Sequence, residues 1–466
     1  MMNTVLSSVF FFIVALGILI TIHEFGHYWV ARKMGVKVLR FSIGFGNPLW
    51  THHGKVDNTE YVIAAIPLGG YVKMLDEREA PVAPHELHRA FNRQPLRSRF
   101  AIVFAGPLFN FLLAILVYWV VFMIGISGLK PVVGAVTPNS IAHSSGLQAG
   151  DVIVEVNGKI TPTWETVVLA MLDKALEQQA VTIKVRDSNQ LDVIRNLNLT
   201  TITGSDLDQG NLLESIGITP SRPKLPAVLG QLEKDSPAQQ AGLQVGDKII
   251  AVDGQPVADW DAWVAYVRPR ANQVIHVDIE RSRATGSGAQ LERQVFQVRP
   301  AAVTTKDGTI GRIGVGVKVP DELPAELRSI LRYSPGEAIM PAIIKTWDMS
   351  VLTLRMLYKM ITGVLSTSNL SGPISIAQYA GSSADAGFVA FLGFLAIVSI
   401  SLGVLNLLPI PLLDGGHLMY YLIEAVKGSP VSDDAQLLGQ RVGIALLGTL
   451  MIFAFYNDLA RLFAPQ

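Results

Sequence analysis

Two histidines and a glutamate stand together at the end of a strongly apolar segment near the start of the chain. His23, Glu24 and His27 follow Val5–Ile22, eighteen residues without a charged side chain. An acid at mid-bilayer costs about 2.5–3.5 kcal/mol on insertion scales, so a bound cation is the best compensation. His23 and His27 are four apart and share one helix face, where they can bind one metal ion. Glu24 lies beside them and can reach a metal-bound water, which is the chemistry of a zinc hydrolase placed in a membrane.

A carboxylate at the end of another apolar stretch is the best candidate for a third ligand. Asp414 closes Ala386–Leu413. At 1.5 Å per residue, His23 lies ~27 Å along a ~30 Å hydrocarbon core. Because the stretch before Asp414 runs in the same direction as the first, both motifs reach a similar depth on the same side. We therefore expect His23, His27 and Asp414 to hold Zn²⁺, with a fourth position open to water.

The residues just before Asp414 favour an irregular backbone. Pro409 and Pro411 are expected to break the helix and let the carboxylate turn inward. Asn406 offers a donor and an acceptor that could fix an extended peptide. A structural cap is the alternative role for Asp414, and His417 is either a competing ligand or an interface histidine. The remaining histidines show no ligand spacing and are expected to be solvated: His52, His53, His85, His88, His143 and His276.

Composition places the chain among membrane proteins. Of its 466 residues, 50% are hydrophobic and 16% charged, and the mean hydropathy is +0.36. The formal net charge is zero, so nothing suggests a nucleic acid partner. Cysteine is absent, which excludes disulfides, thiolate zinc ligands and a cysteine nucleophile.

Four segments are expected to span the bilayer. Three are uncharged and long enough, namely Val5–Ile22, Phe100–Ile126 and Ala386–Leu413; Val442–Asn457 is shorter and needs residues 437–440 to complete it. Basic residues concentrate between the first two spans. They are Arg32, Lys33, Lys37, Arg40, Arg89, Arg93, Arg97 and Arg99.

This charge asymmetry predicts the orientation of the chain. Residues 31–99 are expected on the cytoplasmic side, and residues 127–385 with both termini on the opposite side, the periplasm of a bacterium. The active site is then within the membrane, near its cytoplasmic side.

The large segment between the second and third spans contains a repeat. Residues 146–151 (Gly-Leu-Gln-Ala-Gly-Asp) recur 96 residues later at 242–247 (Gly-Leu-Gln-Val-Gly-Asp). Each copy continues as a strand, an Asn-Gly or Asp-Gly turn, and a helix containing tryptophan. The expected strands are Val152–Val156 and Lys248–Val252, and the expected helices Thr163–Leu172 and Asp259–Val267.

Two further regions flank the expected spans. Val36–Ile43 and Tyr61–Ile66 are strand-like, separated by Gly44-Phe45-Gly46, and form either a sheet that enters the membrane or a surface hairpin on the cytoplasmic face. Before the third span, four charged residues share one helix face, which predicts an amphipathic helix at the membrane or against the second repeat. They are Lys345, Asp348, Arg355 and Lys359.

Taken together, these motifs resemble the site-2 proteases over essentially the whole chain. The resemblance rests on the His23–His27 motif, the repeats and five further segments: Pro67–Lys73, Phe91–Pro95, Gly106–Asn110, Gly372–Ile374 and Asn406–His417. The repeats resemble tandem PDZ domains, which either bind peptides by adding a strand or act as spacers. Their peptide-binding turns would include Gly217, Ile218, Gly314 and Val315.

The resemblance implies a zinc endopeptidase of the bacterial inner membrane with Glu24 as general base. It would cut single-span membrane proteins, such as an anti-sigma factor or remnant signal peptides, after another protease has removed their periplasmic part. That activity belongs to the envelope stress response, with the PDZ-like pair excluding uncut substrates. A helical substrate must unwind first; we expect the strand at Tyr61, Val62 and Ile63 to take it up, with Asn406 opposite.

Two other functions compete with this interpretation. A non-proteolytic PDZ membrane scaffold would use the same metal structurally. A zinc transporter would place ionisable groups along several spans, whereas the middle of the second span has none.

The expected fold is a multi-span α-helical membrane protein with four transmembrane helices, a membrane-associated β-sheet region and two tandem PDZ-like α+β domains. Its expected parts are the first transmembrane helix (1–35), the β region with an amphipathic segment (36–98), the second helix (99–127), the PDZ-like domains (128–221 and 222–322), the amphipathic connector (323–385), the third transmembrane segment (386–424) and the fourth helix (437–459).

Overall fold

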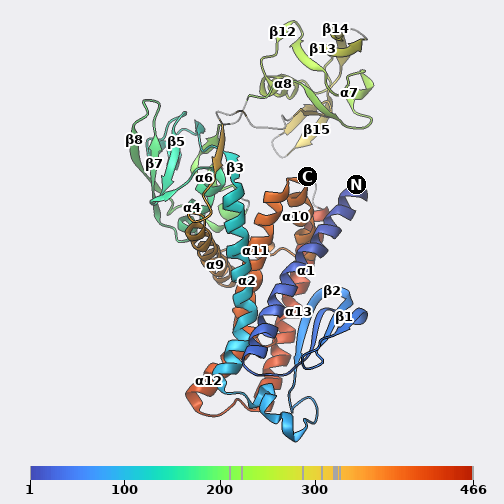
Figure 1. Cartoon of the computed structure of the whole chain (residues 1–466). Helices are drawn as coiled ribbons and strands as arrows, with labels where there is room; N and C mark the ends of the chain where they lie inside the picture. Colours follow the sequence, from blue (N-terminus) through green and yellow to red (C-terminus); the bar gives the residue numbers. More distant parts are fainter. Residues whose placement is uncertain are drawn as a thin grey trace.

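The computed structural model describes residues 2–208, 211–221, 224–285, 288–305, 308–318, 324 and 327–463. Within these ranges, four helices are long and apolar enough to cross a membrane. They are α1 (Met2–Lys33), α2 (Leu96–Ile124), α11 (Phe388–Leu407) and α13 (Asp433–Phe463). In Figure 1, α1 begins and α13 ends at the end of the bundle from which two β-rich units project.

Small and branched side chains hold the bundle together. Ala15 and Leu19 of α1 pack with Ala114 of α2 and with Ala396 and Ile400 of α11, all nearly or fully buried. Helix association in a membrane depends on such close packing, because lipid tails are as apolar as leucine. The apolar residues left exposed on the outer faces are those that lipid would cover.

The helix break before Asp414 is confirmed. Helix α11 ends at Leu407, and a new helix, α12 (Asp414–Lys427), begins at Asp414. The intervening residues contain both prolines, and Leu412 has a φ of +93°, a conformation that a bulky residue adopts only under constraint. Asp414 therefore lies at the start of a helix, directly after a strained turn.

The sheet beside α1 is more complex than the sequence predicted. Strands β1 (Val38–His53) and β2 (Glu60–Met74) both bend, and their four segments pair side by side in the order 48–53, 60–66, 38–45 and 70–74. The Gly44–Gly46 segment does not end the strand. Both glycines have positive φ, +92° and +86°, and the chain turns there and continues.

The predicted substrate strand lies inside this sheet. Val62 pairs with Ser42 on one side and with Thr51 on the other, and its neighbours Tyr61 and Ile63 are likewise paired on both sides. A peptide can add only to an edge with unpaired backbone groups. The prediction that Tyr61, Val62 and Ile63 receive an added strand is therefore wrong, and the free edge nearest α1 belongs to residues 70–74.

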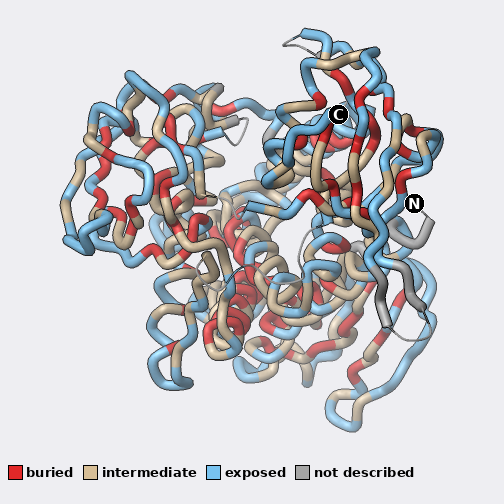
Figure 2. The backbone as a smooth tube through the Cα atoms, turned by 90° about the horizontal axis from the view of Figure 1, so that it is seen from above, coloured by how far each residue is buried: buried red, intermediate tan, exposed pale blue. Residues whose placement is uncertain are grey.

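The four-stranded sheets of the two β-rich units have the same strand order. The first contains a sheet in the order β6-β5-β7-β8 beside helix α4 (Trp164–Leu176), and the second a sheet in the order β12-β11-β13-β14 beside α8 (Trp260–Val267). The predicted strands β5 (Val152–Val156) and β11 (Lys248–Val252) are confirmed to the residue. Viewed from above, buried residues gather inside each unit and in the bundle (Figure 2).

The remaining elements of the first unit are β3 (Ile126–Leu129), β4 (Val133–Val136), α3 (Ile141–Ser144), β6 (Lys159–Ile160), β7 (Ala180–Arg186), β8 (Asp192–Asn198), α5 (Gly204–Asp208), α6 (Leu212–Ile216) and β9 (Ile218–Pro220). Those of the second unit are β10 (Leu229–Leu232), α7 (Pro237–Gln240), β12 (Gln255–Pro256), β13 (Ile275–Thr285), β14 (Gly288–Val298), β15 (Ala301–Thr305), β16 (Gly308–Arg312) and β17 (Val315–Val317). Outside them lie the short helices Pro84–Arg89, Phe91–Arg93 and Thr367–Asn369, with β18 (Arg328–Leu331), α9 (Ile339–Ile361) and α10 (Pro373–Asp385).

The amphipathic helix α9 contacts the first repeat. The sequence had predicted that this helix lies at the membrane or against the second repeat. Arg355 pairs with Asp173 of α4 and with Glu177 just after it, and Lys159 pairs with Asp348 of α9 at 2.6 Å. An apolar cluster that includes Leu176 and Leu352 lies beneath these ion pairs. The first unit is thus anchored to the bundle through α9.

Candidate active site

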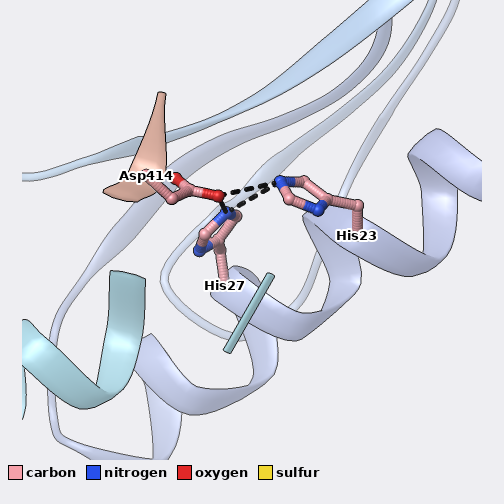
Figure 3. A group of neighbouring side chains, drawn as sticks. All are labelled: His23, His27 and Asp414. Carbon is pink, nitrogen blue, oxygen red and sulfur yellow. Dashed lines mark hydrogen bonds and ion pairs between the residues drawn. The ribbon is translucent and has the colours of Figure 1, made fainter. Parts of the chain in front are cut away.

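Three side chains from two distant segments meet beside the last third of α1. The Oδ2 atom of Asp414 lies 3.2 Å from Nε2 of His23 and 3.4 Å from Nε2 of His27, and the two nitrogens are 3.2 Å apart. Figure 3 shows both imidazoles projecting from α1 toward the carboxylate. His23 and His27 are only 8% and 9% exposed. The spacing of four residues and the helix break at Asp414 together produce this arrangement.

The three atoms fit one zinc ion. With metal–ligand bonds of about 2.0–2.1 Å, two ligands of a tetrahedral site lie about 3.3–3.4 Å apart, close to all three observed separations. The Oδ2 atom of Asp414 is buried, and its only close polar neighbours among the described residues are these two imidazole nitrogens, with no hydrogen bond formed to it. Two neutral imidazoles compensate a buried carboxylate poorly, and a cation between the three atoms would compensate it.

A glycine keeps the space beside the imidazoles open. Gly106 lies in α2, and a Cβ at this position would stand 2.2 Å from Nε2 of His27 and 2.9 Å from Cε1 of His23. Gly26 of α1 faces α2 in the same way, since its Cβ would lie 2.4 Å from the carbonyl oxygen of Ala105. The two glycines let the helices cross closely at the site.

Both imidazoles also make a contact through Nδ1, the ring nitrogen that faces away from Asp414. Nδ1 of His27 lies 2.8 Å from the carbonyl oxygen of Ile102, which makes Nδ1 the protonated nitrogen and leaves Nε2 free to bind a metal. Nδ1 of His23 lies 3.1 Å from the side-chain amide of Asn110, whose Oδ1 is buried without a partner among the described residues. A half-turn of the amide would bring Oδ1 to the Nδ1–H of His23 and give that proton an acceptor.

These supporting residues were largely missed from the sequence. The sequence singled out Asn110 only as the end of the Gly106–Asn110 segment, and Ile102 gave no signal because its contact is a backbone carbonyl. Ser399 of α11 donates a hydrogen bond to the carbonyl oxygen of Asn110 at 2.7 Å, so two spans, α2 and α11, support the imidazoles of α1.

Glu24 lies on α1 between the histidine pair and the sheet. A Cβ at Gly70 would stand 2.9 Å from Cγ of Glu24 and 2.9 Å from Ile20. The free edge at residues 70–74 therefore passes directly beside the predicted general base. A peptide paired with this edge would lie next to Glu24.

Two other predicted residues remain outside the group of three. Asn406 is in the last turn of α11, half-buried, and its side chain makes no hydrogen bond within the described part of the chain. His417 is not among the clustered donors, and its ring lies edge-on to that of Tyr420. The six histidines expected to be solvated are all exposed.

The predicted peptide-binding turns of the repeats occupy equivalent positions. Gly217 and Gly314 have φ of +86° and +73°, and each is followed by a short strand. A Cβ on either would strike Ser140 or Ser236, serines that are 96 residues apart. The side chain of Ile218 is 2% exposed, so a peptide could meet only its backbone. Peptide binding by Gly217, Ile218, Gly314 and Val315 stays a prediction.

Comparison with known proteins finds a family and several relatives that match nearly the whole chain. The profile of peptidase family M50 matches residues 11–450. The chain is 44% identical over 461 residues to the Regulator of sigma E protease of Salmonella typhi, covering 99% of this chain and 100% of that protein. It is 45% identical over 453 residues to the Regulator of sigma-E protease RseP of Escherichia coli (strain K12), covering 97% and 98%.

A relative in Vibrio cholerae is 42% identical over 462 residues, 99% of this chain and 100% of that protein, and its name includes the words zinc metalloprotease. With four helices able to span a membrane and a histidine pair at the end of the first, the chain belongs to peptidase family M50, the site-2 proteases, and is a zinc metalloprotease.

Proposed function

We propose that this chain is an endopeptidase of the bacterial inner membrane that cuts single-span membrane proteins within or at the edge of the bilayer. In this proposal His23, His27 and Asp414 hold Zn²⁺ and Glu24 is the general base. The observation that carries it is the set of three ligand atoms 3.2–3.4 Å apart at the end of a membrane-spanning helix. Ionisable residues in an apolar span are costly, so a group of this kind is expected there only if it has a function within the membrane.

The chemistry that zinc supplies when bound is polarisation of the scissile carbonyl and a lowered pKa for water at its open position. The Glu24 carboxylate accepts the proton from the attacking water and then donates it to the leaving amine nitrogen. The carbonyl of Ile102 holds His27 in the tautomer that directs Nε2 to the metal, and Asn110 would do the same for His23 once its amide is turned so that Oδ1 accepts from Nδ1–H. Gly106 keeps room for the two imidazoles in this arrangement.

Substrate entry requires unwinding, because a helical segment uses its own carbonyls in hydrogen bonds. The free edge at residues 70–74 supports a mode in which the unwound segment pairs with this edge. Asn406, without a hydrogen-bond partner in the described structure, would hold the peptide from the other side. This mode replaces the one predicted for Tyr61–Ile63.

The names of the relatives support a physiological role. Proteins 44–45% identical to this chain are named regulators of sigma E protease, and we assign this chain to the same envelope stress response. Its substrates would then be an anti-sigma factor and remnant signal peptides, already shortened by a periplasmic protease. The two β-rich units, which we interpret as tandem PDZ domains on the periplasmic side, would exclude uncut substrates.

The direct test uses a single-span model substrate without its periplasmic domain. The purified full-length protein is expected to cut it, to lose that activity with a zinc chelator and to regain it on adding zinc. The same substrate with a folded periplasmic domain attached should be cut much more slowly. If the chelator has no effect on cleavage, or no cleavage occurs, the non-proteolytic scaffold becomes the better explanation.

The substrate edge gives a separate prediction. Neighbouring residues of a strand direct their N–H groups to opposite sides, so proline at Tyr71 and proline at Val72 remove different hydrogen bonds. One variant loses pairing with β1 and is expected to lower thermal stability. The other loses the outward N–H together with its side-chain contacts, so it is compared with alanine at the same position. Relative to that alanine it is expected to lower kcat/KM about tenfold, the effect of roughly one hydrogen bond, with zinc content and stability kept. If neither proline lowers kcat/KM, the peptide does not pair with this edge.

A further inference from the structure

The fourth spanning helix touches the rest of the protein at two places. Of the described side chains in α13, those that are buried are Gly443 and a group near the end of the helix, Ala454, Asn457 and Asp458. The residues between these places are mostly exposed, as expected for a lipid-facing surface. Fifteen residues separate Gly443 from Asp458, about 22 Å along a helix.

The first contact lies against the turn that precedes Asp414. A Cβ on Gly443 would stand 2.0 Å from the carbonyl oxygen of Pro411. One turn earlier, a Cβ on Gly439 would stand 2.2 Å from the hydroxyl of Tyr420 in α12. Both positions are thus in close contact with the segment that carries the third ligand, and Gly443 meets backbone that cannot rotate away.

The same turn is confined from its other side. The first turn of α12 folds back on it, since a Cβ on Gly415 would stand 2.1 Å from the carbonyl oxygen of Leu408, and one on Gly416 would stand 2.6 Å from that of Ile410. Leu412 is held at a φ of +93° between these contacts. Such a conformation persists only when its surroundings enforce it.

The second contact fixes α13 along its axis. Asp458 is 1% exposed and accepts hydrogen bonds from the backbone N–H groups of Gly372, Ile374 and Ser375 at 2.9–3.1 Å, at the start of α10. Asn457 donates to the carbonyl oxygen of Thr367 at 2.7 Å. These hydrogen bonds fix the position of α13 along its axis. Because the rise of a helix per residue is fixed, Gly443 stays level with Pro411.

We propose that Gly443 is a positioning residue: through its contact with Pro411, α13 holds the strained turn at Leu412 and so directs the Asp414 carboxylate toward His23 and His27. Gly439 supports the same segment through Tyr420. The inference rests on the proposed function in that it takes Asp414 as a zinc ligand. It adds a role in the site for a helix that contributes no ligand.

The test compares Gly443→Ala with Gly448→Ala in the full-length protein. Gly448 lies on the same helix, and a Cβ there meets nothing within 4 Å, so both variants gain the same helix propensity. We expect Gly443→Ala to lower kcat by about 10–100-fold, the range typical of residues that orient metal ligands, with KM changed less than about twofold. Zinc transfer to a chelator should accelerate by a similar factor.

Cobalt substitution reports the geometry directly. The visible absorption of Co²⁺ in this site should change in shape and intensity for Gly443→Ala and remain that of the unmodified protein for Gly448→Ala. A purely structural role would lower thermal stability without altering the Co²⁺ spectrum. An unchanged spectrum together with unchanged kcat in Gly443→Ala overturns the proposal.

A compensating pair keeps the test informative if Gly443→Ala fails to fold. The Tyr420 hydroxyl is buried without a partner among the described residues, so Tyr420→Phe alone should be nearly neutral. Gly439→Ala should lower kcat and alter the Co²⁺ spectrum, and Tyr420→Phe should restore both, because it removes the atom that the new methyl meets. If the double variant is no better than Gly439→Ala, the steric argument is wrong.

Failure of the inference and failure of the proposed function give different results. Asp414→Ala tests the ligand itself and should abolish zinc binding. If Asp414→Ala keeps its zinc, the proposed function fails. If it loses zinc while Gly443→Ala behaves like Gly448→Ala, only the positioning role fails.

Discussion

Glu24→Gln is expected to abolish cleavage of a truncated single-span substrate while zinc stays bound. Glutamine keeps the size of the side chain and one acceptor oxygen, but its amide cannot take a proton from water. General bases contribute about 10²–10⁴-fold to catalysis, and here the same group also protonates the leaving amine, so we expect a loss near the upper end. Zinc content by metal analysis and cleavage by gel assay measure the two effects on one sample.

The matched variants separate the base from the ligands. His23→Ala should lose zinc and activity together, since it removes one of three atoms that lie 3.2–3.4 Å apart. Glu24→Asp keeps the carboxylate but shortens its reach, and is expected to retain zinc with a small residual activity. Rapid cleavage by Glu24→Gln would falsify the assignment of Glu24 as the base.

The chemistry of the site could be predicted from the sequence because it depends on short-range rules. The spacing of His23 and His27 fixes their common helix face, and the depth calculation places Asp414 on the same side of the bilayer. The Asn-Gly and Asp-Gly turns were also local signals. Asn157 and Asp253 have φ of +49° and +45°, as these tight turns require.

The sheet beside α1 could not be predicted in the same way. Strand β1 bends at Gly44 and Gly46, β2 bends between Ile66 and Gly70, and the segments pair in a non-sequential order that encloses Val62 between Ser42 and Thr51. Strand pairing depends on contacts between segments distant along the chain, which hydrophobic periodicity does not report. The identity of the edge, and with it the expected substrate strand, therefore required the structure.

The support behind the ligands was beyond sequence reasoning for a related reason. Ile102 acts through its carbonyl, Asn110 through an amide buried between three spans, and Gly106 through the absence of a side chain. None of these contributions has a distinctive pattern along the chain. Each contribution depends on the way α2 crosses α1 at Gly26, which is a contact between segments distant along the chain.

Gly106→Ala is expected to empty the metal site although it adds only one methyl group. The new Cβ would stand 2.2 Å from Nε2 of His27 and 2.9 Å from Cε1 of His23, far inside van der Waals contact. The imidazoles must then move away from Asp414. We expect zinc content to fall at least about tenfold, the lower end for disturbed ligand orientation, and activity to fall with it.

The expected loss of zinc from Gly106→Ala cannot be explained by a less stable helix α2. Alanine favours a helix over glycine by about 1 kcal/mol, so the substitution should strengthen α2 in isolation. Gly17→Ala in α1 is the matched control, because a Cβ there meets nothing within 4 Å, and it should keep both zinc and activity. Serine at position 106 should be at least as damaging as alanine. If Gly106→Ala retains full zinc and full cleavage, the imidazoles have more freedom than the site geometry allows, and binding of the metal between His23, His27 and Asp414 is refuted.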